Sequence, residues 1–242
     1  MPILSGIHPV AEALRSNRPL ERVLVAQGAG GPRLQEIIDQ SRRAGIAVRF
    51  EPRAVLDRLA GTPAHQGVVA MGAAHKYADL AEVAAAELLV ILDGVEDPHN
   101  LGAIIRTAHA AGAGSVIVPE RRSASLTDVV AKAAAGALEY LPVTRVININ
   151  RTLEDLKKQG YWIYGLDERG AEDYDQVAYA TPTALVLGGE GKGLHEQVRK
   201  HCDALVRIPM VGRISSLNVS VAAGIVLFEW KRRRQAALTR TD

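Results

Sequence analysis

Residues 88–111, LLVILDGVEDPHNLGAIIRTAHAA, contain the pattern that decides the fold class of this chain. Residues 88–92 are continuously apolar, which is typical of a parallel strand that is covered on both faces. From residue 101 onward the apolar side chains recur at intervals of three and four, which indicates a helix with one buried side. A buried strand followed by a helix is the repeating unit of an α/β fold.

The same alternation of strand and helix extends in both directions from this stretch. On the C-terminal side we expect strands at residues 115–118, 143–147, 162–166, 184–187 and 204–208. Helices are expected between and after them, at residues 126–135, 152–159, 194–201 and 217–234. On the N-terminal side we expect strands at 23–26, 46–50 and 67–71, and helices at 32–44 and 52–59. The pattern predicts an α/β protein with a mostly parallel sheet and helices packed on it.

A stretch rich in alanine, without strong apolar periodicity, separates the two series of strands and helices. We predict that residues 73–86 form a linker that ends in a short helix. The chain is then divided into a small α/β domain at residues 1–72 and a larger domain at residues 87–242. A chain of 242 residues, 48% of them hydrophobic, is long enough for two such domains with a buried core each.

Composition excludes several classes of protein. The most apolar windows fall short of the ~20 residues that span a bilayer, and the N-terminus lacks a secretion signal, so we expect a cytoplasmic protein without a membrane partner. The single cysteine, Cys202, cannot form an internal disulfide. The histidines show no pair at the spacing of a metal-binding helix, and we therefore expect no metal.

Local basic clusters, and not the net charge of +2, suggest a nucleic-acid partner. The first is Arg42-Arg43 with Arg49, Arg53 and Arg58. The others are Arg121-Arg122 and the run at residues 231–234. Each cluster is a candidate for phosphate contact, and for each the alternative is a solvated helix face. Several such clusters in both domains favour an RNA partner.

Three polar stretches lie where a predicted strand gives way to a helix, at residues 97–107, 187–194 and 208–220. Backbone amides and carbonyls are free at such junctions, and glycine allows a ligand to approach them closely. Three junctions of this kind in one chain indicate a ligand site that is built from loops.

In the first stretch, Asn100 stands at the position of a helix N-cap, after Pro98. Arg106 falls about 150° from the centre of the apolar stripe of its helix, at 100° per residue. It therefore points toward solvent, substrate or a second subunit. Plain capping by Asn100 and an ordinary surface charge at Arg106 are the alternatives.

The second stretch is a glycine loop around Glu190, and it matches neither nucleotide-binding pattern. Lys192 is followed by Gly193 instead of Ser or Thr, and the spacing of a dinucleotide-binding loop is absent. A carboxylate would repel a phosphate, so the loop suits a cationic or hydroxyl-bearing ligand better. The alternative is a tight turn with an exposed glutamate.

The third stretch places Ser215, Ser216 and Asn218 at the start of the last helix, where they can cap it and also bind a ligand. The helix that follows is apolar nearly all round. A terminal helix of this kind must be buried on several sides, so we expect a homodimer through it, with burial inside its own domain as the alternative.

In their order along the chain and in their residues, these three motifs resemble those of the SpoU (TrmH-type) family of RNA ribose 2'-O-methyltransferases, in the SPOUT class. The resemblance covers about the last two thirds of the chain. It implies S-adenosyl-L-methionine as cofactor and a deep trefoil knot in the C-terminal domain. The segments at residues 4–14 and 65–70 resemble the small ribosomal-protein-L30e-like domain that binds the RNA substrate in many members. Together they imply a guanosine in 23S rRNA as the target.

The family's functional positions match residues of this chain one by one. The resemblance implies catalytic roles for Asn100, Arg106, Glu190, Ser216 and Asn218. It implies contacts to the cofactor for Gly188, Gly189, Ile208 and Leu217. A tRNA ribose methyltransferase and a non-catalytic RNA-binding factor of ribosome assembly stay open as alternatives.

Overall fold

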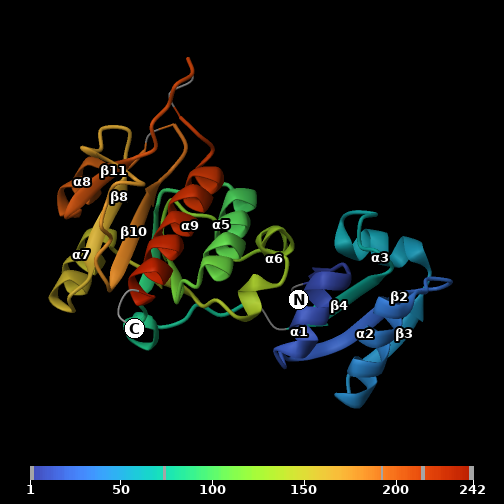
Figure 1. The fold of residues 1–242 in the computed structure, drawn as a ribbon. Helices are drawn as coiled ribbons and strands as arrows, with labels where there is room; N and C mark the ends of the chain where they lie inside the picture. Colours follow the sequence, from blue (N-terminus) through green and yellow to red (C-terminus); the bar gives the residue numbers. More distant parts are fainter. Residues whose placement is uncertain (1–2, 73–74, 192, 214–215, 240–242) are drawn as a thin grey trace. The chain divides into compact units, whose positions relative to one another are not determined.

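The computed structural model describes residues 3–72, 75–191, 193–213 and 216–239 (Figure 1). The chain divides into two compact units. The first comprises Met1–Lys76 with Leu126–Tyr140, and the second comprises Tyr77–Ser125 with Leu141–Asp242. The units part inside the range that the sequence predicts as a linker. The predicted division differs at Leu126–Tyr140, because helix periodicity does not reveal which of two cores a helix joins.

The first unit is a four-stranded sheet with helices packed on it. Its strands, in the order β1-β4-β2-β3, are β1 (Ile3–Ser5), β4 (Val68–Gly72), β2 (Leu20–Ala26) and β3 (Ala47–Glu51). Its helices are α1 (Ile7–Arg15), α2 (Pro32–Arg43), α3 (Arg53–Ala60), α6 (Asp128–Ala134) and the short 3-10 helix η1 (Ala137–Glu139). β2 runs parallel to β3 and antiparallel to β4, so this sheet is mixed.

The segment Leu126–Tyr140 belongs to the first unit through apolar and polar contacts. Ala131 and Leu138 pack in the same core as Val10, Val23 and Ile37. The segment also supplies an ion pair: Arg18 Nη1 lies 2.9 Å from Glu139 Oε1, and both side chains are buried. Removing one partner of such a pair leaves an uncompensated buried charge. The ion pair therefore holds Leu126–Tyr140 against the rest of the first unit.

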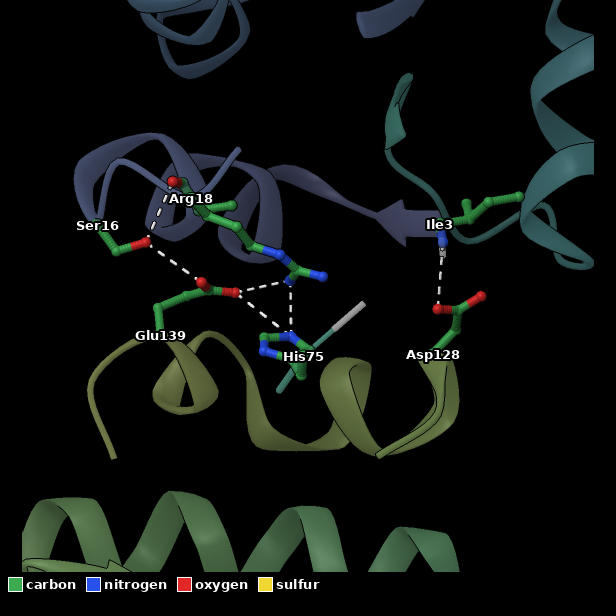
Figure 2. Close-up of polar contacts among 7 residues, drawn as sticks. Ile3, Ser16, Arg18, His75, Asp128 and Glu139 are labelled. Carbon is green, nitrogen blue, oxygen red and sulfur yellow. Dashed lines mark hydrogen bonds and ion pairs between the residues drawn. The ribbon is translucent and has the colours of Figure 1, made fainter. Parts of the chain in front are cut away.

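His75 contacts the Arg18–Glu139 ion pair, as Figure 2 shows. The same figure shows the hydrogen bond that Ser16 donates to Glu139. Its Nε2 lies 2.6 Å from Arg18 Nη1. Because a guanidinium only donates hydrogen bonds, Nε2 must accept this one and His75 must be neutral. Burial, and then the charge of Arg18, lower the pKa of His75 to about 4.

The stability of the protein should therefore depend on pH through His75. Between the ordinary pKa of 6.5 and about 4, the unfolded chain binds a proton at His75 that the folded chain does not. The free energy of unfolding should fall as the pH decreases through this window, by about 1 kcal/mol between pH 7 and pH 5. Urea denaturation at both pH values measures it. His75→Gln keeps an acceptor for Arg18 and should lose this part of the pH dependence; parallel profiles for the two proteins would contradict the assignment.

The second unit is built on a seven-stranded sheet in which every described pair of strands is parallel. Its strands, in the order β7-β6-β5-β10-β8-β11-β9, are Val143–Val146, Ser115–Pro119, Leu88–Asp93, Thr183–Gly188, Trp162–Leu166, Ala204–Arg207 and Glu172–Asp173. Its helices are α4 (Leu80–Val83), α5 (Pro98–Ala111), α7 (Ile149–Lys158), α8 (Glu196–His201) and α9 (Val219–Leu238). The prediction of an α/β fold with a mostly parallel sheet is confirmed.

Helices cover both faces of this sheet, as continuously apolar strands require. On one face, Val186 of β10 packs in a core with α7 and α8. Side chains of a strand alternate between faces, so Thr183 of β10 points to the opposite face. There Trp230 Nε1 of α9 donates a hydrogen bond to Thr183 Oγ1 at 2.8 Å. Figure 1 shows α9 (red) beside α5 (green), and Lys231 Nζ of α9 donates to the Ala110 carbonyl of α5 at 3.0 Å.

Within the described residues, none of the helices combines the length and the apolar character that crossing a bilayer requires.

Candidate functional site

The site forms at the carboxyl ends of the central strands β5 and β10. In a parallel α/β sheet the loops that leave these ends meet at one edge, which is where such folds bind ligands. Here the Gly189 amide donates to the carbonyl of Asp93 at 2.8 Å and joins the two loops. The ends of β5 and β10, from which two of the predicted site loops leave, therefore lie side by side.

Glycine is required where these loops touch. A Cβ on Gly189 would lie 2.1 Å from the Gly94 carbonyl oxygen, and one on Gly188 would lie 2.1 Å from the Gly193 carbonyl carbon. Both distances are far below any real contact, and the obstacle is backbone that cannot step aside. The two glycines thus let the loop after β10 fold back on itself and against the loop after β5.

Asn100, Glu190 and Asn218, one from each polar stretch, form a single hydrogen-bonded cluster. Glu190 Oε1 accepts from Asn100 Nδ2 at 2.5 Å and from Asn218 Nδ2 at 3.1 Å. Asn218 Nδ2 also donates to Asn100 Oδ1 at 3.0 Å. We call these three residues the amide–carboxylate cluster. It ties together three segments that are far apart in the sequence.

The helix caps explain how two of these side chains are aimed. Asn218 is the N-cap of α9: its Oδ1 accepts from the amides of Ser220 and Val221, which leaves Nδ2 for the cluster. The N-cap of α5 is Asp97, which accepts from the amides of His99 and Asn100. The sequence prediction that Asn100 is an N-cap is wrong. Pro98 occupies the first helical position, so Asn100 lies inside the first turn and its side chain is free for Glu190.

A cavity of about 650 Å³ lies on one side of Glu190. All four residues expected to contact a cofactor line it, together with three of the predicted polar residues: Gly188, Gly189, Ile208, Leu217, Glu190, Ser216 and Asn218. Lys192 and Ser215, which the sequence placed in the same loops, lie outside the described residues. We call this space the first cavity.

A second cavity, of about 510 Å³, adjoins the same loop. Gly189, Glu190 and Gly193 line both cavities. Asn100 lines only the second, together with the loop after β5, His195 and Arg122. Glu190 therefore stands between two spaces, each of a size that holds a small ligand.

Arg106 is the predicted site residue that the structure does not bring to the cluster. It is exposed on α5, lines neither cavity, and has no hydrogen bond or ion pair with the described residues. Its direction, away from the apolar stripe of α5, is as predicted. Within one copy of the chain, the site lacks this cation.

Sequence patterns missed two carboxylates that shape the cavity walls. Asp93 accepts from the His195 amide at 2.8 Å and from His195 Nδ1 at 2.9 Å. Asp167, also buried, accepts from Arg199 Nε at 3.0 Å. Both stand at or just after the last residue of an apolar strand, and this position was the available signal. Among the described residues, no group of three His, Cys, Asp or Glu side chains could hold a metal ion.

Comparison with known proteins identifies the chain's relatives. Residues 87–228 match the SpoU rRNA Methylase family, and residues 3–78 match the family described as RNA 2'-O ribose methyltransferase substrate binding. YacO of Bacillus subtilis, which is named as a TrmH family tRNA/rRNA methyltransferase, is 44% identical over 236 residues, which cover 95% of this chain and 94% of YacO.

Solved structures that resemble this chain are methyltransferases of the same kind. The SpoU methyltransferase AviRb from Streptomyces viridochromogenes, in complex with the cofactor AdoMet, superimposes with a TM-score of 0.81 at 28% identity, over 97% of this chain and 90% of AviRb. An AdoMet-bound rRNA methyltransferase from Sinorhizobium meliloti gives a TM-score of 0.80 at 27% identity, over 95% of this chain and 86% of that one. With family matches in both parts of the sequence, the chain belongs to the SpoU rRNA methylase family and is an RNA methyltransferase of the TrmH/SpoU type.

Proposed function

We propose that this protein methylates the ribose 2'-hydroxyl of a guanosine in 23S rRNA, with S-adenosyl-L-methionine as the methyl donor. The observation that carries the proposal is the amide–carboxylate cluster. It joins the three motifs between two cavities, and a reaction that brings a donor and an acceptor together needs such an arrangement.

The first cavity fits S-adenosyl-L-methionine. Its wall contains glycine backbone at Gly188 and Gly189, which can approach an adenosine closely, and the carboxylate of Glu190, which suits a positive sulfonium. Backbone groups of Ile208 and Leu217 would hold the other side. When bound, the cofactor supplies an activated methyl group.

Within the chain, Asn100, Asn218 and Glu190 would hold the reacting ribose in line with the donor, and Ser216 would support the cofactor side. Arg106 would stabilise the alkoxide that develops on the 2'-oxygen, because a guanidinium stays charged and can only donate. Since Arg106 does not reach the cluster of its own chain, we propose that it acts in the site of a second copy.

A homodimer through the C-terminal helix α9 would place Arg106 of one chain in the site of the other. α9 packs beside α5, and it exposes Val221 and Phe228, with 51% and 48% of their surface accessible. Apolar side chains this exposed on a helix favour a partner surface. In this proposal the two α9 helices meet, and the α5 helix beside each carries its Arg106 to the partner's site.

We propose that the first unit binds the RNA. Arg42, Arg43, Arg49, Arg53 and Arg58 are exposed on it. Phe50, at 49% exposure on β3, could stack on an unpaired base. A cytoplasmic location and the trefoil knot of the second unit, both expected from the sequence, belong to the same proposal.

The test is a transfer assay with radiolabelled S-adenosyl-L-methionine on unmodified large-subunit rRNA and, separately, unmodified tRNA. Label should enter the rRNA only, and mapping should locate it at one guanosine as a block to alkaline cleavage beside the 2'-position. Label on tRNA alone would favour the tRNA methyltransferase, a substrate class that the name of YacO includes. Binding of RNA without affinity for the donor would favour the assembly factor.

A further inference from the structure

The proposed donor site leaves the second cavity without an assigned ligand, although this cavity shares Gly189, Glu190 and Gly193 with the first. Group transfer needs the reacting atoms about 3–3.5 Å apart, so the space for the acceptor must adjoin the space for the donor. If the proposed function holds and the first cavity takes the donor, the second is the neighbouring space for the acceptor.

Four carboxylates line the second cavity. Asp93, Asp97 and Glu190 accept hydrogen bonds from groups of the protein, whereas Glu96 is exposed and accepts none from the described residues. Both oxygens of Asp97 accept amides of α5, and both oxygens of Asp93 accept from His195. These bonds satisfy the carboxylate oxygens of Asp93 and Asp97. They also fix the ring of His195, so this part of the cavity is built before any ligand arrives.

Arg122 is the cationic side chain of this wall that is free to bind a ligand. It lines the second cavity, is exposed, and has no hydrogen bond or ion pair with the described residues. Its backbone is left-handed, with φ of 60°, which is uncommon for a residue other than glycine. Its planar, forked guanidinium matches two phosphate oxygens at once.

We propose that the second cavity receives the nucleotide to be methylated and that Arg122 binds the phosphate beside its ribose. Arg122 is thus a positioning residue: it fixes the backbone so that the 2'-hydroxyl lies at the Glu190 wall. This inference rests on the proposed function, and it adds the contact that holds the acceptor. Arg121, its neighbour, is also exposed but does not line the cavity, and it provides a matched control.

The experiment compares Arg122→Gly, Arg122→Lys and Arg121→Ala with the wild type. Glycine adopts the left-handed backbone without steric strain, so Arg122→Gly removes the guanidinium without straining the loop. Steady-state transfer to large-subunit rRNA gives kcat and KM. Binding of the same RNA in the presence of S-adenosylhomocysteine, at several salt concentrations, gives Kd and its salt dependence.

For Arg122→Gly we expect a KM for RNA that is about 10- to 100-fold higher, with a much smaller change in kcat. The slope of log Kd against log salt should become shallower by about 1, as for the loss of one phosphate contact. Arg122→Lys should keep the salt slope and recover part of the KM. Arg121→Ala should keep the wild-type KM.

Equal effects of Arg122→Gly and Arg121→Ala, or no effect of either, would overturn the proposal. A wild-type protein that transfers no methyl group to RNA would defeat the proposed function instead. In that case the RNA-binding measurement alone tests Arg122. A loss of RNA affinity confined to Arg122→Gly supports the phosphate contact, and an equal loss in Arg122→Gly and Arg121→Ala rejects it.

Discussion

Replacing Glu190 with alanine should lower the rate of methyl transfer by about 100-fold or more, which is the usual effect of removing one preorganised electrostatic group from an active site. Glu190 Oε1 accepts from Asn100 and from Asn218, so the change leaves two amides without their acceptor and unlinks three loops. It also removes a carboxylate from the wall of the first cavity. Single-turnover assays with saturating RNA and donor measure the rate.

Glu168→Ala is the matched control, since Glu168 is an exposed carboxylate on the same cavity with no hydrogen bond to the described residues. Its rate should stay within about threefold of the wild type, as for most surface changes away from special contacts. Glu190→Gln separates the two functions of the side chain, because it keeps an acceptor oxygen and loses the charge. If Glu190→Ala and Glu168→Ala reduce the rate equally, the amide–carboxylate cluster is not the centre of the site.

Arg106→Ala should also abolish most activity, by about 100- to 1000-fold, if its guanidinium stabilises the developing alkoxide. Arg106→Lys should recover little, because an ammonium lacks the planar fork. Near-normal turnover of the lysine variant would show that the forked geometry is unimportant. Donor binding should remain as in the wild type for both variants, since Arg106 lines neither cavity.

Mixed dimers test whether Arg106 acts in the partner's site. One subunit carries Arg106→Ala and the other Glu190→Ala, and two affinity tags isolate the mixed species. If Arg106 acts across the interface, one of the two sites contains both intact residues, and about half of the wild-type activity returns. If it acts within its own chain, both sites are defective and no activity returns. Failure to obtain mixed dimers from co-expressed subunits would count against the homodimer itself.

Local patterns predicted most of the strands and helices. The strand at Trp162–Leu166 has the predicted bounds, because an apolar run between a turn and a polar residue leaves little freedom. β1 and β9 were not predicted, since strands of three and two residues are too short to show a periodicity. α1 also lacks a start signal in the sequence, because it begins at Gly6 without a side-chain cap.

The site was predictable as a set of residues and not as a geometry. Glycine and polar side chains at the ends of apolar strands marked the loops around Glu190 and Asn218. The sequence does not single out Asp93 and His195, because their importance depends on a contact between residues that are 102 positions apart. In the sequence, Arg122 is only one of a basic pair, and the cavity that distinguishes it from Arg121 has no counterpart there.

By itself, the sequence determined the α/β class, the buried strands, the exposure of Arg106 and the family, because these depend on side chains within a few residues of one another. Tertiary structure alone decided that Leu126–Tyr140 joins the N-terminal core. It also decided that Glu190 contacts Asn100, which is 90 residues away in the chain. Such contacts depend on the order of strands in the sheet, and strand order is set by the packing of the whole core, which no local pattern contains.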